Sequence, residues 1–307
     1  MAVGAGGATV TGGTPARGEA GGPSPTDRAP ARALWVNGRI VRGGEATLSL
    51  FDRGARDGEG LFETLRVESG QPLDWDRHME RLVLSAAEMG FPVPPAPSRL
   101  RHGLAQVLAA EGLSDAAARI TVTRGIPGGR PTRTGCWIEA EALRGRLWPG
   151  TRRGEASAIF SKRPYHPGAL GRFKTTSRLA YALAREEARA ARVDETLLCT
   201  SEGDVLEGSV SNVFVVERGE VLTPPLSRGI LPGLARRGVL EACRALGITA
   251  REAPLAREAL FAAEEVFLTN SIQQVVALGV LEGRALAGRE SSRLLLEAWR
   301  SVFAARP

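Results

Sequence analysis

The stretch GRFKTTSRLAYALAREEA, residues 171–188, holds one of only two lysines in the chain. The protein has 40 lysines and arginines together, and all except Lys162 and Lys174 are arginine. A desolvated lysine can lose its proton and attack a carbonyl group, whereas a guanidinium group stays protonated. Lys174 lies in a glycine-containing loop before an amphipathic segment, where its side chain can project into a cleft. We therefore favour Lys174 as a reactive amine, with chance retention of a surface lysine as the alternative.

The segments around Lys174 alternate between helical and strand patterns. We expect a helix over residues 175–191, with Leu179, Ala182 and Leu183 on its apolar face. A second helix is expected over residues 232–247, because proline favours the first turn of a helix and glycine its end. Apolar runs predict strands at 155–163, 195–200, 209–216, 219–224, 264–271 and 275–286.

The first half of the chain reads as antiparallel hairpins with two helices. Asn37-Gly38 and Ser69-Gly70 each lie between apolar flanks, a pattern that favours a tight hairpin turn. Helices are expected over 76–90 and 100–112, and strands over 118–125 and 135–143. The pattern changes near residue 150, so we predict an α+β or α/β fold with domains at 33–150 and 151–307. Residues 1–32 are rich in glycine, alanine, proline and threonine and predict a disordered tail.

Composition excludes several classes of function. The net charge is +6, but the basic residues are interleaved with 34 acidic ones and aromatic residues make up only 5%, which argues against nucleic-acid binding. Apolar runs fall short of the roughly 18 residues that a membrane helix needs. Three scattered cysteines and three histidines offer no metal site, and they favour a cytoplasmic protein.

Two further features would suit an aldehyde cofactor that carries a phosphate group. Gly233, Leu234 and Ala235 offer backbone N–H groups at an expected helix start, where the helix dipole favours an anion. Glu207 ends an expected strand, where its carboxylate could meet a ring nitrogen. An ordinary helix start and an exposed turn glutamate are the alternatives.

At this point the ordered motifs resemble a known family. The segments DRGARDGEGLFETLRV, HMERL, KTTSRLAYALAREEA, DVLEGSVSNVFVV, TPPLSRGILPGLAR and FLTNSIQQVV occur in the order typical of the class IV, or fold type IV, pyridoxal-phosphate enzymes. That family includes branched-chain and D-amino-acid aminotransferases and 4-amino-4-deoxychorismate lyase. The resemblance extends over about residues 34–290.

The resemblance implies roles for individual residues. Lys174 would form the Schiff base with pyridoxal 5'-phosphate and carry protons, and Glu207 would keep the pyridine nitrogen protonated. Arg81 would bind the phosphate. The other implied phosphate contacts are Gly233, Leu234, Ala235, Ser271 and Ile272, although many relatives have threonine where this chain has Ala235. The family fold has two α/β domains with the cofactor between them, usually in a homodimer.

Three features of the resemblance favour the lyase. Phe62 stands where D-amino-acid aminotransferases have a tyrosine, and Asn270 belongs to a lyase-like FLTNSIQQVV segment. TVTRGIPGGRP resembles the arginine- and glycine-rich loop of the lyase, in which Arg130, or else Arg124, would bind a substrate carboxylate. The sequence therefore predicts an aminodeoxychorismate lyase that acts on a small amine. An aminotransferase for branched-chain or D-amino acids and a non-catalytic protein of the same fold are the alternatives.

Overall fold

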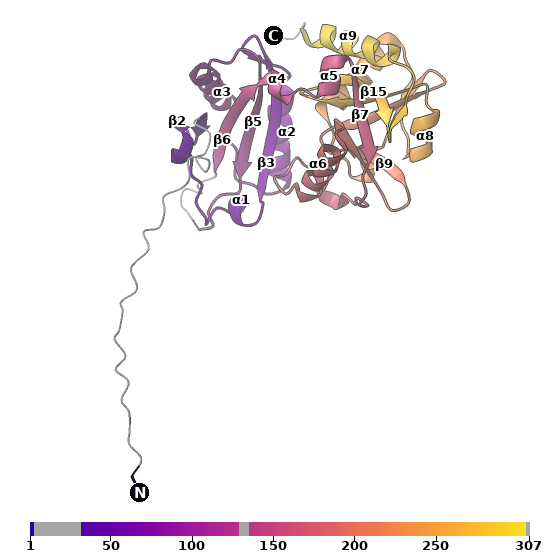
Figure 1. Cartoon of the computed structure of the whole chain (residues 1–307). Helices are drawn as coiled ribbons and strands as arrows, with labels where there is room; N and C mark the ends of the chain where they lie inside the picture. The colour runs from indigo at the N-terminus through magenta and orange to yellow at the C-terminus, as the bar shows by residue number, and fades with distance from the viewer. Residues whose placement is uncertain (3–31, 129–134, 305–307) are drawn as a thin grey trace.

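The computed structural model describes residues 1–2, 32–128 and 135–304, the side chains only as far as residue 301. The predicted tail lies outside the described residues, apart from its first two residues and Arg32. The described chain forms two sheets that lie side by side, one from each half of the sequence (Figure 1).

The first sheet is antiparallel and has the strand order β2-β1-β6-β5-β3-β4. Its strands are β1 (Ala33–Val36), β2 (Arg39–Arg42), β3 (Gly60–Glu68), β4 (Gln71–Pro72), β5 (Ala116–Thr123) and β6 (Cys136–Ala142). Both predicted hairpin turns are confirmed, because Asn37-Gly38 joins β1 to β2 and Ser69-Gly70 joins β3 to β4, all with positive φ.

Two helices pack on one face of this sheet, α2 (Trp75–Glu88) and α3 (Pro97–Glu111). Leu61, Leu65 and Val67 of β3 point into the core beneath these helices. Since side chains alternate along a strand, Phe62 and Thr64 point to the opposite face, toward the second half of the chain. Short helices α1 (Arg53–Arg56) and α4 (Leu143–Arg146) flank the sheet.

The second sheet is mixed, with the order β12-β11-β10-β14-β15-β7-β8-β9-β13 and β16 beside β15. Parallel pairs are β11·β12, β15·β7 and β7·β8. Its strands are β7 (Glu155–Phe160), β8 (Glu195–Cys199), β9 (Asp204–Gly208), β10 (Asn212–Glu217), β11 (Glu220–Thr223), β12 (Ala250–Glu252), β13 (Leu255–Ala256), β14 (Glu265–Asn270), β15 (Gln274–Leu281) and β16 (Arg284–Ala285).

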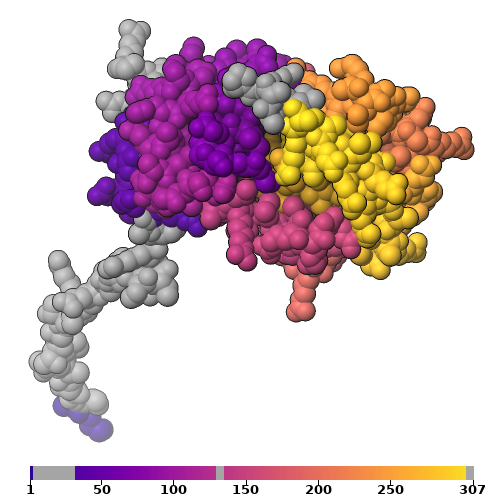
Figure 2. Space-filling view, turned by 90° about the horizontal axis from the view of Figure 1, so that it is seen from above, coloured from indigo at the N-terminus to yellow at the C-terminus, as the bar shows by residue number. Residues whose placement is uncertain are grey.

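Helices pack against both faces of the second sheet. α7 (Leu234–Leu246) and α9 (Glu290–Ala304) pack together over the stacked rings of Phe214 and Phe267, and α9 lies on the surface of this half (Figure 2). The others are α5 (Pro149–Arg153), α6 (Leu179–Ala191) and α8 (Arg257–Ala262). No helix in the described segments is long and apolar enough to span a bilayer.

The predicted apolar face of the helix after Lys174 is wrong. Leu179 and Leu183 are 73% and 40% exposed, and the buried side chains of α6 are Tyr181, Ala184 and Ala188. Small alanines let α6 approach β8 closely, and the ring of Tyr181 fills a cluster with Leu198, Leu206 and Ile230. The helix also begins at Leu179 rather than at residue 175, because the preceding residues pair with β3.

Candidate active site

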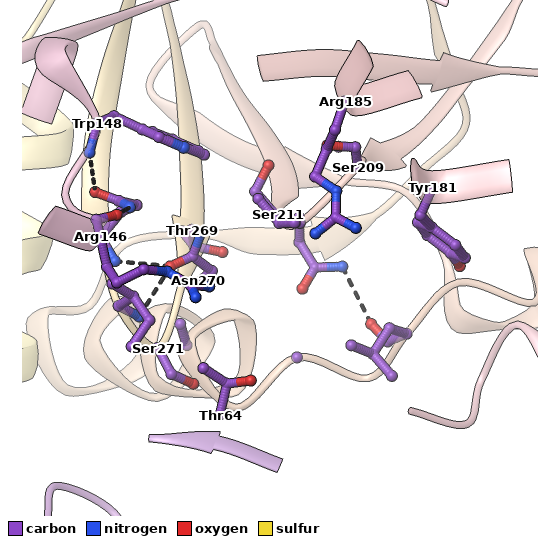
Figure 3. A pocket seen from close by; sticks show the side chains of 18 of the residues that line it. Thr64, Arg146, Trp148, Tyr181, Arg185, Ser209, Ser211, Thr269, Asn270 and Ser271 are labelled. Atoms are coloured by element: carbon purple, nitrogen blue, oxygen red, sulfur yellow. Dashed lines mark hydrogen bonds between the residues drawn. The ribbon is translucent and has the colours of Figure 1, made fainter. Parts of the chain in front are cut away.

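A cavity of about 810 Å³ lies between the two halves of the chain, and Figure 3 shows part of its lining. The structure brings every described residue of the predicted site to this one cavity. They are Phe62, Arg81, Lys174, Glu207, Gly233, Leu234, Ala235, Asn270, Ser271 and Ile272. Arg130 lies outside the described residues, so its predicted contact with a carboxylate stays a prediction.

Lys174 is held in the cavity by its own backbone. The N–H of Phe62 donates to the Lys174 carbonyl at 2.9 Å, and the N–H of Thr176 donates to the Gly60 carbonyl at 2.8 Å, so the lysine segment extends the edge of β3. The half-buried amine lies 4.7 Å from the centre of the Phe62 ring. Lys162, by contrast, is exposed.

The surroundings of Lys174 favour a neutral amine. Burial disfavours the ammonium form, and the guanidinium groups of Arg178 and Arg81 add repulsion, which together lower its pKa to about 7. About half of an amine with this pKa is neutral at pH 7, so it can act as a nucleophile or base, as carbonyl chemistry requires.

One end of the cavity is built around Arg81 of α2. Its guanidinium donates two hydrogen bonds to the buried carboxylate of Glu63, at 2.8 and 2.6 Å, and a third to the Pro232 carbonyl at 3.0 Å. Nδ1 of His78 lies 2.7 Å from Glu63 on the side away from the cavity. Two guanidinium N–H groups have no partner among the described residues, so Arg81 is fixed in place and can still bind an anion.

Glu63 was not predicted from the sequence. Burial alone would raise its pKa, but the charge and hydrogen bonds of Arg81, with help from His78, lower the pKa to about 2. Burial also lowers the pKa of His78. The alternation of β3 could have identified Glu63, because it occupies a core-facing position between Leu61 and Leu65 and therefore needs a buried partner.

The amino end of α7 completes this end of the cavity, as predicted. Gly233 is the N-cap and makes no side-chain cap bond, so backbone N–H groups of the first turn are left for an anion. A Cβ at Gly233 would lie 2.0 Å from Oδ1 of Asn212, so only glycine fits there. The Asn212 amide in turn donates to the Leu231 carbonyl at 3.1 Å and fixes the approach to the helix.

A second region of the cavity, next to the first along the Leu231–Pro232 segment, contains Glu207 of β9. It is only 2% exposed, which contradicts the alternative of an exposed turn glutamate. Its carboxylate accepts hydrogen bonds from the Tyr181 hydroxyl at 2.9 Å and from the N–H of Leu231 at 3.1 Å. Burial raises its pKa to about 7, although Arg178, Tyr181 and Leu231 act in the opposite direction.

A tight turn between β14 and β15 supplies the remaining predicted contacts. Oδ1 of Asn270 accepts from the N–H groups of Ile272 and Gln273, at 2.9 and 2.7 Å, so only the amide nitrogen of Asn270 is left to face a ligand (Figure 3). Thr269, not predicted from the sequence, has a buried hydroxyl without a hydrogen-bond partner among the described residues and lines the cavity.

Two cations that were not predicted from the sequence line the cavity, Arg119 of β5 and Arg178 at the start of α6. The Arg119 guanidinium lies 3.7 Å from the centre of the Phe62 ring, and Arg178 lies 3.3 Å from that of Tyr181. Burial lowers the pKa of Arg119. Neither arginine makes an ion pair within the described part of the chain. Arg124, by contrast, forms an ion pair with Glu59, donates a hydrogen bond to the Met89 carbonyl and lies outside the cavity.

The donor set fits pyridoxal phosphate. A neutral amine suits an aldehyde, and Arg81 with the start of α7 suits a phosphate. A buried carboxylate suits a pyridine nitrogen, and the Thr269 hydroxyl, which has no hydrogen-bond partner among the described residues, can bond a ligand in this cavity. These three kinds of group line one cavity.

Comparison with known proteins gives consistent results. Residues 60–278 match the family model for class IV aminotransferases. A putative branched-chain-amino-acid aminotransferase of Methanocaldococcus jannaschii is 29% identical over 88% of this chain and 96% of its own. Aminodeoxychorismate lyase of Bacillus subtilis is 29% identical over 81% of this chain and 86% of its own. The pyridoxal-phosphate-bound structure of a hypothetical aminotransferase from Mycobacterium tuberculosis is 25% identical, with a TM-score of 0.79 over 89% of this chain and 99% of its own.

Proposed function

We propose that this chain, which belongs to the class IV aminotransferases, a family of pyridoxal-phosphate-dependent enzymes, is 4-amino-4-deoxychorismate lyase. Its cofactor is pyridoxal 5'-phosphate, and membership of an enzyme family removes the non-catalytic alternative. The proposed reaction releases pyruvate from aminodeoxychorismate and leaves 4-aminobenzoate.

The cationic wall of the cavity is the observation that carries this proposal. Arg119 and Arg178 line the cavity without an ion pair among the described residues, and Arg185 lies beside them. Aminodeoxychorismate carries two carboxylates, and a guanidinium recognises a carboxylate by paired hydrogen bonds. Both side chains are half-buried, so their guanidinium groups are partly desolvated and can bind a carboxylate that the substrate supplies.

We assign the cofactor contacts from the charge and hydrogen-bonding groups of the residues that line the cavity. Arg81, the N–H groups of Leu234 and Ala235, and the turn at Ser271 and Ile272 would hold the phosphate, with Gly233 leaving room for it. Glu207 would accept a hydrogen bond from the ring nitrogen. When bound, the cofactor withdraws electrons from the substrate carbon next to the amine.

Lys174 would move the protons of the reaction. Its neutral Nζ takes the proton from the ring carbon that carries the substrate amine. The carbon–oxygen bond of the enolpyruvyl ether then breaks, the oxygen leaves with the electron pair as an enolate, and a proton delivered to the methylene carbon of this enolate gives pyruvate. Atoms balance without water, and the remaining ring becomes aromatic. Phe62 places an apolar face without a hydroxyl beside Lys174.

The second candidate is an aminotransferase for branched-chain or D-amino acids. Leu147, Trp148 and Ile272 line the same cavity and offer an apolar surface for an aliphatic side chain. Such an enzyme would leave the amino group on the cofactor and need a keto acid as the second substrate.

The test is pyruvate release from aminodeoxychorismate by the purified, cofactor-loaded enzyme in the absence of any keto acid. We expect stoichiometric pyruvate and 4-aminobenzoate. Conversion of the cofactor to its amine form by leucine or D-alanine, without pyruvate release from aminodeoxychorismate, would support the aminotransferase instead. The Lys162→Arg variant is the matched control for Lys174→Arg, because only the second removes the amine from the cavity.

We also propose that the enzyme is a cytoplasmic homodimer. Leu50 and Phe51 are 82% and 69% exposed, as expected for side chains that pack against a second copy. Cys136, Cys199 and Cys243 are buried free thiols, which suits a reducing compartment. Sedimentation analysis of the wild type and of Phe51→Ser tests the dimer, which the substitution should weaken.

A further inference from the structure

A hydrogen-bonded chain of two tyrosines lies behind Glu207. The Tyr165 hydroxyl donates to the Tyr181 hydroxyl, which donates to Oε1 of Glu207 at 2.9 Å. The two rings meet edge to face, with centroids 5.2 Å apart. All three side chains are buried, so water does not replace these hydrogen bonds.

The direction of these two hydrogen bonds follows from the final acceptor, the Glu207 carboxylate. A carboxylate only accepts hydrogen bonds, so Tyr181 must donate to Glu207, and the oxygen of Tyr181 is then free to accept from Tyr165. A donor that itself accepts a hydrogen bond becomes a stronger donor. Tyr165 therefore strengthens the bond that Tyr181 makes to Glu207.

The groups that face Glu207 come from several elements. Lys174 and Arg178 act on it from the segment before α6, Tyr181 from α6, and the N–H of Leu231 from the loop before α7. Both hydrogen-bond donors are neutral, so they stabilise the ionised carboxylate without cancelling its charge. Glu63 differs in this respect, because Arg81 neutralises it directly.

We propose that Tyr181 is a positioning residue, oriented by Tyr165, that keeps the Glu207 carboxylate aligned and ionised so that the shared proton stays on the ring nitrogen of the cofactor. This inference rests on the proposed role of Glu207. Tyr181 itself touches neither cofactor nor substrate in this role, and acts only through Glu207.

Loss of the Tyr181 hydrogen bond should shift the proton that Glu207 shares with the ring nitrogen of the cofactor. A hydrogen bond to a charged group contributes about 1.5–3 kcal/mol, so its loss raises the proton affinity of Glu207 by about tenfold to hundredfold. The proton between Glu207 and the ring nitrogen then moves toward Glu207. Tyr165→Phe removes only the supporting bond and should produce a smaller shift in the same direction.

The experiment uses the full-length enzyme loaded with pyridoxal phosphate labelled with ¹⁵N in the ring. The ring ¹⁵N resonance distinguishes protonated from unprotonated pyridine, and it is compared in wild type, Tyr181→Phe, Tyr165→Phe and Glu207→Gln at pH 7. Phenylalanine keeps the ring that packs against Ala184, Leu198 and Leu206. Thermal melts and cofactor dissociation constants establish that each variant is folded and saturated.

We expect the protonated position in wild type, a large displacement toward the unprotonated position in Glu207→Gln, an intermediate displacement in Tyr181→Phe and a smaller one in Tyr165→Phe. A wild-type resonance in Tyr181→Phe, with a displaced one in Glu207→Gln, would overturn the inference and leave the role of Glu207 intact. An unchanged resonance in Glu207→Gln would overturn both. Neither result depends on whether the reaction is a lyase or a transamination.

Discussion

Two buried glutamates, Glu207 in the wall of the cavity and Glu63 behind Arg81, behave in opposite ways. Glu63, 1% exposed, faces Arg81 and His78, and its pKa falls to about 2. Glu207, 2% exposed, accepts from a tyrosine and a backbone N–H, and its pKa rises to about 7. Burial acts on both in the same direction, so the partners decide the outcome.

The difference assigns separate tasks to the two carboxylates. Glu63 is permanently charged near neutral pH and serves to hold Arg81 rigid at the anion end. Glu207 is balanced between its charged and neutral forms, which suits a group that shares a proton with a ligand. Lys174 lies in the same cavity with a pKa of about 7 and is balanced in the same way.

Replacing the amine should have the largest effect. Lys174→Arg keeps a cation beside Phe62 but removes the nucleophile and proton carrier, so we expect the rate of pyruvate release to fall by about 10⁴-fold. The matched Lys162→Arg should stay within about twofold of wild type. Comparable losses in both variants would contradict the distinction between them.

Removing the charge of Glu63, beside Arg81, should have the next largest effect, a loss of folding stability. Glu63→Gln leaves the Arg81 guanidinium without its counter-charge in a buried site, which costs about 3–5 kcal/mol. The melting temperature of the apoprotein should fall by about 6–15 °C. Glu207→Gln, as the matched control, should melt within a few degrees of wild type. Equal losses of melting temperature in the two variants would contradict the difference between Glu63 and Glu207.

The two glutamates should stabilise the folded state over different pH ranges. Glu63 has a lowered pKa, so its stabilising effect is present above about pH 4.5 and is lost as the pH falls toward 2. Glu207 has a raised pKa, so its effect is present below about pH 4.5 and is lost as the pH rises through 7. Each amounts to about 3 kcal/mol.

Urea unfolding of the apoprotein between pH 4 and 8 measures the second window. Wild type should lose stability toward pH 8 relative to Glu207→Gln, which cannot ionise. Parallel curves for the two proteins would show that Glu207 ionises at its ordinary pH and that the contrast with Glu63 is absent.

The smallest effect is expected from replacing Arg119, which lines the cavity. Arg119→Met should raise KM for aminodeoxychorismate by about tenfold with kcat changed less, because a carboxylate contact present before and during the reaction is lost. Arg146→Gln is the control, since Arg146 lines the cavity but already pairs with Glu141. Equal KM values for the two variants would remove Arg119 from the substrate site.

The sequence predicted the elements that local signals determine. Asn37-Gly38 and Ser69-Gly70 were sufficient to locate two hairpins, and Gly247 ends α7 as expected, although the helix begins at Leu234 rather than at Pro232. The buried face of α6 was mispredicted because size and hydrophobicity alone favoured Leu179 and Leu183. The structure buries Tyr181 instead, since its hydroxyl has a partner on β9, a contact that helical periodicity does not contain.

The sequence identified the site residues that belong to a family motif. It missed those whose role depends on a partner elsewhere in the fold. Lys174, Arg81 and Glu207 were identified by motif and lie in one cavity. Glu63 and Arg119 were missed because their roles depend on contacts across β3, α2 and β5. Alternation along the strands was the available signal, because both are charged residues within otherwise buried strands.

The central claim is that Lys174 is the amine that reacts with the cofactor in a cavity that Arg81 and Glu207 also line. The most direct measurement is borohydride reduction of the cofactor-loaded enzyme, followed by digestion and mass spectrometry of the peptides. The account predicts one reduced cofactor, attached to the peptide that contains Lys174, and none on Lys162 or in Lys174→Arg. Attachment at Lys162, or no attachment in a wild-type enzyme saturated with cofactor, would contradict it.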